Sequence, residues 1–334
     1  MTKNKITIQD VAARAGTSPS TVSRVLTGSA PVSEGLRQSV ERAIAELGYR
    51  PSLVARSLKT QTTYTVGLLV NDITNPFFSA LARGVEEEAN GQGYSLILCN
   101  TNEDPERELK YLQILRDKQV DGIIFGPTGR NDEFIRSLAG RIPLVQIDRQ
   151  MPGLDAPAVL VDNEKAAYQA TRLLVERGHE RIAMLGWGMD ITTSTEREAG
   201  YERALREAGI ALDTRLLARP SQFSHSTLVR AAEELLAQQP RPTAIFAANN
   251  RFGIATLAAI RRFNLTVPDD VALVVFDDID AFSLMSPSIT AVAQPALEMG
   301  RVAMDLMLRL IRTADEAVPP VTLLPTELIV RESV

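Results

Sequence analysis

The sequence has 334 residues, of which 45% are hydrophobic, and a formal net charge of −5. This length and apolar content exclude a disordered chain and suffice for two or three compact units. A single cysteine excludes an internal disulfide, and two histidines are too few for a histidine-rich metal site, so we expect no metal and no cofactor. The sequence contains no apolar run of membrane-spanning length and begins without the apolar block of a signal peptide, which predicts a cytoplasmic protein.

Charge is distributed unevenly along the chain. Residues 1–60 contain nine basic and four acidic side chains, a net charge of +5, which leaves −10 for the remainder. A basic head on an acidic body is typical of a small DNA-binding module attached to a part that does not bind DNA. The net negative charge of the whole chain argues against general coating of nucleic acid.

Two short helical patterns lie between residues 7 and 28, separated by one tight turn. Thr7 can cap the first helix, with Asp10 three residues later, and Gly16 suits the left-handed turn that ends it. Ser18 and Pro19 then form an N-cap followed by proline at the first helical position. The apolar positions that should face inward are Val11, Ala12, Ala15, Val22, Val25 and Leu26. This spacing favours a helix-turn-helix over an ordinary helical hairpin, which remains the alternative.

The outward half of the second helix is where a recognition helix would meet base edges. Arg24 is the cation on this face. The residues that we expect to contact DNA here are Thr7, Ser18, Pro19, Ser20, Thr21, Ser23 and Arg24.

A third helix is predicted after Ser33, a candidate cap, and before Gly48. Its apolar positions recur every three or four residues, at Leu36, Val40, Ile44 and Leu47. The polar stretch KTQTTY at 59–64 then predicts a linker between folded units.

The segments DVAARAGTSPSTVSRVLTG and ELGYRPSLVARSLK resemble the lactose/galactose-repressor (LacI/GalR) family of transcription factors, and the similarity covers nearly the whole chain. The resemblance implies a DNA-binding headpiece over 1–59 whose residues 52–59 form a hinge helix, and a ligand-binding and dimerisation domain over 60–334. It assigns Leu58 as an apolar wedge in the minor groove and adds Ala55 and Lys59 as DNA contacts. A small headpiece acts in pairs on a palindromic operator, and no heptad tail follows LIVRES, so we expect a homodimer.

Beyond the linker, buried-strand patterns alternate with helical ones. A first series of strands and helices is predicted at 65–70, 77–90, 94–99, 105–118, 120–125, 132–139 and 144–147. A second series follows a strand at 159–161, with elements at 164–176, 181–185, 196–208, 226–238, 244–247, 252–263 and 271–276. The pattern predicts an α/β fold with two doubly wound parallel-sheet lobes. By the resemblance, lobe 1 comprises about 64–161 plus 295–325, and lobe 2 about 162–293.

Open parallel sheets bind ligands beyond the carboxyl ends of their strands, so two facing lobes predict a cleft lined by post-strand loops. Flat aromatic rings there can cover the C–H faces of a sugar, while carboxylates, amides and guanidinium groups satisfy its hydroxyls. Each such residue has an alternative, because Asp and Asn after strands also cap helices, and Phe77 or Phe78 can belong to the core.

The body also resembles the periplasmic ribose-binding proteins. The chemistry and this resemblance give as candidate ligand-binding residues Asp72, Asn75, Phe77, Phe78, Asp148, Arg149, Arg197, Phe223, Asn249, Asp277 and Gln294. One departure is Gly126, which stands where the ribose binders have an asparagine and predicts a larger or wetter pocket.

We therefore predict a transcriptional repressor that is controlled by a small sugar, with a pentose favoured. The closest alternative is a purine-responsive repressor of the same family. An exported sugar-binding protein is disfavoured by the helix-turn-helix and the missing signal, and an enzyme by the lack of a GxSxG, Walker A or clustered His/Cys motif.

Overall fold

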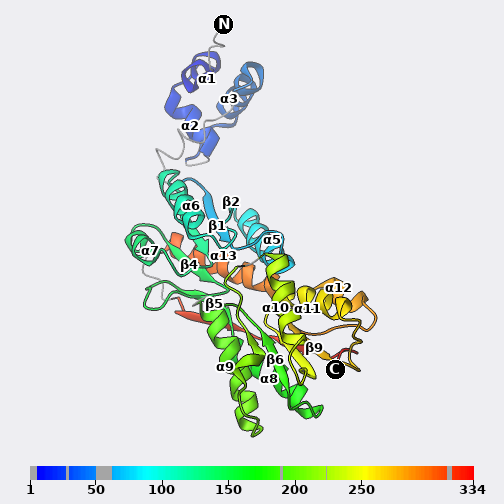
Figure 1. The fold of residues 1–334 in the computed structure, drawn as a ribbon. Coiled ribbons are helices and arrows are strands. Elements are labelled where there is room, and N and C mark those ends of the chain that lie inside the picture. Colours follow the sequence, from blue (N-terminus) through cyan, green and yellow to red (C-terminus); the bar gives the residue numbers. More distant parts are fainter. Residues whose placement is uncertain (1–5, 28–29, 50–61, 189–190, 223, 314–317) are drawn as a thin grey trace. The chain divides into compact units, whose positions relative to one another are not determined.

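The computed structural model describes residues 6–27, 30–49, 62–188, 191–222, 224–313 and 318–334 (Figure 1). The chain divides into two compact units, Met1–Thr63 and Tyr64–Val334. The predicted hinge helix over 52–59, with Ala55, Leu58 and Lys59, lies outside the described residues, as does Phe223.

The first unit contains three helices, α1 (Ile8–Ala15), α2 (Pro19–Thr27) and α3 (Glu34–Leu47). The predicted capping box of α1 is confirmed: the Asp10 amide donates to Thr7 Oγ1 at 3.4 Å, and the Thr7 amide donates to Asp10 Oδ2 at 2.8 Å. Gly16 closes the helix with φ 66°. The Thr21 amide donates to Ser18 Oγ at 3.2 Å, as expected of an N-cap.

The core of this unit is small, with Val11, Val22 and Val40 fully buried. Ser33 occupies the N-cap position of α3, as predicted, but its side chain makes no capping hydrogen bond. Gly48 ends α3 with φ 61°, as predicted.

The second unit contains two six-stranded sheets. The first has the strand order β11-β5-β4-β3-β1-β2, and the second β12-β10-β9-β8-β6-β7. The strands of the first sheet are β1 (Thr65–Val70), β2 (Ser95–Asn100), β3 (Gly122–Phe125), β4 (Leu144–Ile147), β5 (Ala158–Val161) and β11 (Val321–Leu324). Those of the second are β6 (Ile182–Leu185), β7 (Leu217–Ala218), β8 (Ala244–Ala247), β9 (Ala272–Phe276), β10 (Thr290–Ala293) and β12 (Glu327–Ile329).

All strand pairs are parallel except the pair of β10 with β12, which is antiparallel. The predicted fold class, two doubly wound lobes of mostly parallel strands behind a helix-turn-helix, is confirmed. The chain passes from one sheet to the other three times, after β5, after β10 and after β11. We call the first sheet with its helices lobe 1, and the second sheet with its helices lobe 2.

Helices cover both sheets (Figure 1). Lobe 1 contains α5 (Pro76–Gly91), α6 (Pro105–Asp117), α7 (Asp132–Leu138) and α13 (Ala296–Arg312). Lobe 2 contains α8 (Asn163–Glu176), α9 (Thr192–Glu207), the short 3₁₀ turn η1 (Thr214–Leu216), α10 (His225–Leu236), α11 (Asn250–Arg262) and α12 (Asp280–Leu284). Figure 1 shows the late helix α13, in orange, beside the early elements of lobe 1, and it packs against α5.

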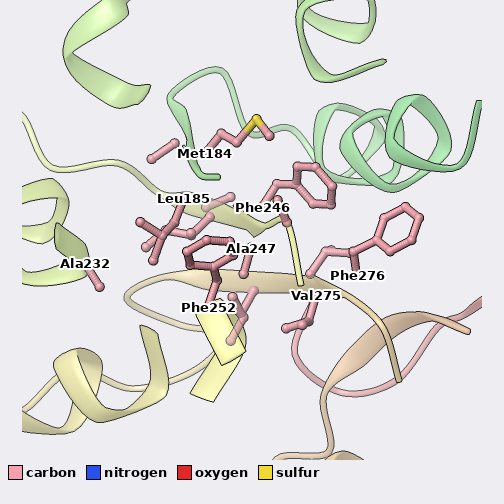
Figure 2. Packing of buried hydrophobic residues seen from close by; sticks show 14 of the residues in the cluster. Met184, Leu185, Ala232, Phe246, Ala247, Phe252, Val275 and Phe276 are labelled. Carbon is pink, nitrogen blue, oxygen red and sulfur yellow. The ribbon is translucent and has the colours of Figure 1, made fainter. Parts of the chain in front are cut away.

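The core of lobe 2 forms where β6, β8, β9, α10 and α11 converge (Figure 2). Phe246, Phe252 and Phe276 are fully buried there. Because the strands are covered on both faces, their residues are almost uniformly apolar, which is why their positions could be predicted as continuous apolar runs.

Two helices of lobe 2 begin two or more residues earlier than predicted. The helix expected from Glu196 starts at Thr192, and the helix expected from Phe252 starts at Asn250. The first turns, TTST and NR, are polar, so apolar periodicity does not mark them. These turns bring additional polar side chains to the edge of the sheet.

Candidate functional site

The outward face of α2 presents the residues predicted to contact DNA. Pro19, Ser20 and Arg24 are exposed, whereas Val22 points into the core. Ser18 Oγ lies 2.7 Å from Ser20 Oγ and 3.0 Å from Thr21 Oγ1, and Thr7 is engaged with Asp10. The helix thus combines an apolar inward side with a short polar outward side, as a recognition helix requires.

A cleft of about 550 Å³, including the solvent at its mouth, lies between the two lobes at the carboxyl ends of their strands. Nine of the predicted ligand-binding residues line it: Asp72, Asn75, Phe77, Phe78, Asp148, Arg149, Arg197, Asn249 and Asp277.

Two aspartates mark corresponding points of the two sheets. Asp148 follows β4 and Asp277 follows β9, and both have left-handed backbone conformations, with φ of 69° and 70°. Aspartate adopts this conformation more readily than most residues, and such strain persists where the surrounding structure fixes it. Both carboxylates are buried and line the cleft.

Arg149 is held by carboxylates of its own lobe. Its two Nη atoms donate to the two oxygens of Glu103, at 3.0 and 3.1 Å, and its Nε donates to Asp148 at 3.3 Å. The arginine is buried, which disfavours its charge, yet Glu103 and Asp148 outweigh that effect and raise its pKa. The bidentate pair fixes the plane of the guanidinium group.

Arg197 is held mainly by neutral groups of lobe 2. Its Nε donates to Asn163 Oδ1 at 2.8 Å and its Nη1 to the Ala248 carbonyl at 2.7 Å. Its Nη1 lies 3.9 Å from Asp277 Oδ2, and its guanidinium carbon lies 3.7 Å from the centre of the Phe276 ring. Burial lowers the pKa of Arg197, because these partners compensate the desolvation of its charge only in part.

Burial raises the pKa of Asp277, and nearby Arg197 and a hydrogen bond from Gln294 oppose this shift. The Gln294 Nε2 donates to Asp277 Oδ1 at 2.6 Å. Gln294 itself lies in a neighbouring groove that it shares with Asp277 and Phe77, rather than in the lining of the cleft.

The amide side chains predicted as ligands also act as helix caps. Asn75 caps α5 by accepting from the Phe77 amide at 3.0 Å, and Asn249 caps α11 by accepting from the Phe252 amide at 2.9 Å. The start of α11 also bridges the lobes, since Asn250 Nδ2 donates to Asn75 Oδ1 at 2.8 Å.

Arg251 forms a second bridge between the lobes, to Asp72. Asp72 also accepts from the Thr74 hydroxyl at 2.6 Å. The predicted polar residues therefore take part in a network that joins the lobes in this structure.

Aromatic rings form the apolar part of the cleft. Phe77 and Phe78 meet edge to face, with ring centres 5.0 Å apart, and both belong to the core of lobe 1 as well as to the lining of the cleft. Trp187, the single tryptophan of the chain, follows β6 and lines the cleft from lobe 2.

Sequence reasoning missed several residues of the lining: Glu103, Trp187, Ile191, Thr193, Ser194, Ala248 and Phe252. Trp187 could have been found from its position just after a predicted strand, by the same rule that selected Asp148. Thr193 and Ser194 lie in the first turn of α9, which the prediction had placed in a loop. No signal in the sequence marks Glu103 as the partner of Arg149.

Gly126 does not enlarge the cleft. A side chain there would meet Asn71 Oδ1 at 2.7 Å, so Asn71 fills the space in question, and Gly126 is not part of the lining. The expectation of a larger or wetter pocket at this point was therefore wrong.

Two family models match the chain. One, described as bacterial regulatory proteins of the lacI family, matches residues 7–52, and the other, described as periplasmic binding proteins and sugar binding domain of LacI family, matches residues 63–332. The chain belongs to the LacI family. It is therefore a DNA-binding transcriptional repressor, as its two motifs predicted.

The family also contains similar repressors with named functions. The transcriptional repressor PurR of Vibrio atlanticus is 37% identical over 92% of this chain and 93% of its own length. The ribose operon repressor of Haemophilus influenzae is 36% identical over 98% of both chains. A solved structure of the regulator CelR in complex with cellobiose covers 98% of this chain and 100% of its own, with 33% identity and a TM-score of 0.74.

Within the described ranges, no helix has the length and apolar character needed to cross a membrane. Those same ranges contain no group of three or more His, Cys, Asp or Glu side chains that could hold a metal ion.

Proposed function

We propose that this repressor is controlled by a small sugar, a pentose in particular, held in the cleft between its lobes. The observation that carries the proposal is that two aromatic rings and two buried carboxylates line the same cleft. These belong to Phe77, Phe78, Asp148 and Asp277. Rings cover the apolar faces of a sugar, and its hydroxyls can donate to the remaining lone pairs of these carboxylates, which an apolar ligand would leave unsatisfied. Asp72, Asn75, Arg149, Arg197, Phe223, Asn249 and Gln294 complete the proposed ligand set.

The comparisons support two effector classes. Similarity to a ribose operon repressor and to a cellobiose-bound regulator favours a sugar. Similarity to PurR favours a purine, and the flat ring of Trp187 in the cleft suits either ligand. We favour the sugar because a purine offers fewer hydroxyl donors to two buried carboxylates.

We further propose that the headpiece binds a palindromic operator as part of a homodimer. A solved structure of the lac repressor dimer bound to operator and an anti-inducer supports this proposal, since it shares the fold of this chain with a TM-score of 0.87. Lobe 2 exposes apolar side chains that a second copy would cover, since Leu284 is 83% exposed and Ile254 and Met285 are 40% and 37% exposed. Light scattering of the full chain at micromolar concentration should give the mass of a dimer, and a monomer with and without operator would contradict it.

The DNA contacts that we propose are Thr7, Ser18, Pro19, Ser20, Thr21, Ser23, Arg24, Ala55, Leu58 and Lys59. The relatives are transcriptional regulators, and we propose that the cleft binds its ligand without transforming it.

Calorimetry on the full chain tests the effector. D-ribose should bind far better than hypoxanthine or guanine, and Asp277→Asn should abolish most of that affinity, because asparagine keeps the left-handed backbone but removes the charged acceptor. The matched control is Asp278→Asn, since Asp278 is bonded to Arg331 at 2.6 and 2.8 Å and does not line the cleft. Tighter binding of a purine would overturn the sugar and leave the repressor intact.

Binding of labelled upstream DNA tests the headpiece. Arg24→Ala should weaken operator binding by about 1–3 kcal/mol, the value of a good base contact. Arg37→Ala removes the same charge from an exposed site on α3 and should change the affinity much less. Equal effects of the two substitutions would contradict the assignment of α2. Repeating the titration with bound sugar measures the coupling between the two sites.

A further inference from the structure

We infer that the carboxylate of Glu103 acts as a permanent anion in the cleft. It accepts the hydrogen bonds of Arg149 and so restricts the effector to molecules that carry no anionic group near Arg149. Glu103 lines the cleft, and its side chain is only 9% exposed. This inference rests on the proposed function, in which the cleft is the effector site. It names the class of sugar accepted, a neutral one rather than a phosphorylated or acidic one.

Donors from Arg149 and Asn71 satisfy both oxygens of the Glu103 carboxylate. Both Nη atoms of Arg149 donate to its carboxylate, and Asn71 Nδ2 donates to Oε2 at 3.0 Å. Asp148 bonds only the Nε edge of Arg149, so Glu103 is the group that covers the bidentate edge. Planar guanidinium edges of this kind bind carboxylates and phosphates in many proteins. Here that edge is already used by a side chain of the protein.

The backbone around Glu103 is arranged to place it there. Asn102 and Glu103 both have left-handed conformations, with φ of 55° and 57°. Each such residue costs free energy, which the surrounding structure must offset. The bidentate pair with Arg149 and the hydrogen bond from Asn71 hold the Glu103 side chain in this position.

The other charged side chains of the described lining already have partners in the protein. The described lining contains four carboxylates, at Asp72, Glu103, Asp148 and Asp277, and two arginines. Arg197 donates to Asn163 and Ala248 and lies near Asp277. Arg251 pairs with Asp72, so the cleft keeps a formal excess of one negative charge, which disfavours an anionic ligand in a buried site.

The test removes Glu103 and supplies an anion from solution. Glycine suits φ 57°, so Glu103→Gly empties the site without adding backbone strain. The melting temperature of the full chain should fall by about 10 °C, because Arg149 loses its main partner. Replacing chloride by formate at equal ionic strength should then raise the melting temperature of this variant by at least about 3 °C and leave the wild type unchanged.

The matched control is Glu198→Gly. Glu198 forms a comparable two-pronged pair with Arg219, with contacts of 2.7 and 2.5 Å, but neither residue lines the cleft. This pair is partly exposed, so formate should add no specific stabilisation there. Equal rescue of both variants, or no rescue of Glu103→Gly, would overturn the inference. These outcomes do not depend on which effector the repressor uses.

A second variant keeps the shape of the side chain and tests the ligand class. Glu103→Gln removes the charge, and it serves also if Glu103→Gly fails to fold. With D-ribose and ribose 5-phosphate as probes, the wild type should prefer the neutral sugar. Glu103→Gln should reduce that preference at least about ten-fold, since it removes the negative charge that repels the phosphate. An unchanged ratio would contradict the specificity role, and failure of both probes in the wild type would instead count against the sugar assignment.

Discussion

Lobe 1 and lobe 2 place an aspartate at the same point, directly after the fourth strand in sequence of each sheet, with φ of 69° at Asp148 and 70° at Asp277. The arginines beside them are held differently. Arg149 forms a bidentate pair with Glu103, and its pKa is raised, whereas Arg197 is held by an amide and a carbonyl, and its pKa is lowered. The two lobes thus share a backbone framework. The arginine of lobe 1 is paired with carboxylates, whereas the arginine of lobe 2 is bonded mainly to neutral groups.

Two lobes of the same topology can therefore form a site whose two sides differ in charge compensation. A ligand between the lobes meets two guanidinium groups. That of Arg149 in lobe 1 is already paired with Glu103, and that of Arg197 in lobe 2 has weaker charge compensation. The side with less compensation gains more from a new hydroxyl partner, because its charge is buried at greater cost. We therefore expect ligand contacts to change the electrostatics of lobe 2 more than those of lobe 1.

The largest test of the comparison is to remove each arginine. Arg149→Met should lower the free energy of unfolding by about 3–5 kcal/mol, because Glu103 and Asp148 remain buried without their cation. Arg197→Met should cost less, about 1–3 kcal/mol, because mainly neutral acceptors lose a donor. Urea unfolding of the full chain, followed by the fluorescence of Trp187, measures both. Equal losses of unfolding free energy in the two variants would mean that Arg149 and Arg197 do not differ in charge compensation.

The second test concerns a feature that the lobes share. In lobe 1, a Cβ at Gly300 would lie 2.1 Å from the Leu81 carbonyl oxygen, and in lobe 2 a Cβ at Gly200 would lie 2.2 Å from the Glu164 carbonyl oxygen. Each glycine allows two helices to approach closely, so Gly300→Ala and Gly200→Ala should each destabilise their lobe by about 1–3 kcal/mol.

Gly91→Ala is the control for this pair, because nothing lies within 4 Å of its Cβ position at the end of α5. It should leave the free energy of unfolding unchanged or raise it by up to about 1 kcal/mol, because alanine favours the helix. A large difference between the Gly200 and Gly300 variants would show that one helix pair can separate without disturbing its sheet.

The smallest effect is the pH dependence of Asp277. Burial raises its folded-state pKa above 3.8, so the folded protein binds this proton more strongly than the unfolded chain does. Stability from this group therefore falls as the pH rises from 3.8 through the folded pKa. Asp277→Asn removes that dependence, so the stability of the variant relative to the wild type should increase with pH in this window.

Urea titrations between about pH 4 and 7 measure this difference. Asp148→Asn gives the comparison for lobe 1, where loss of the acceptor of Arg149 Nε should destabilise the protein at neutral pH by about 1–2 kcal/mol. A stability difference for Asp277→Asn that falls with pH would contradict the raised pKa.

The sequence by itself determined the features that depend on local rules. Thr7, Asp10 and Gly16 set the limits of α1 through capping and a left-handed turn, and these bonds form within a few residues. The apolar runs of the strands follow from burial on both faces, which fixed the alternation of strand and helix. The positions of Asp148 and Asp277 at the carboxyl edges of their two sheets follow from that alternation together with parallel pairing. Arg197, in contrast, was selected by family resemblance, because its place within α9 carries no local signal.

The tertiary structure decided which side chains meet across the cleft. Glu103 reaches Arg149 from a loop 46 positions away in the sequence, and Asn250 reaches Asn75 from the other lobe. Neither contact has a period, cap or spacing that would reveal it, because each depends on strand order and on how two lobes face each other. Apolar periodicity likewise could not mark the polar first turn of α9, which adds Thr193 and Ser194 to the site. Pairing between distant loops is set by the packing of whole sheets, and only the folded chain brings those residues within hydrogen-bonding distance.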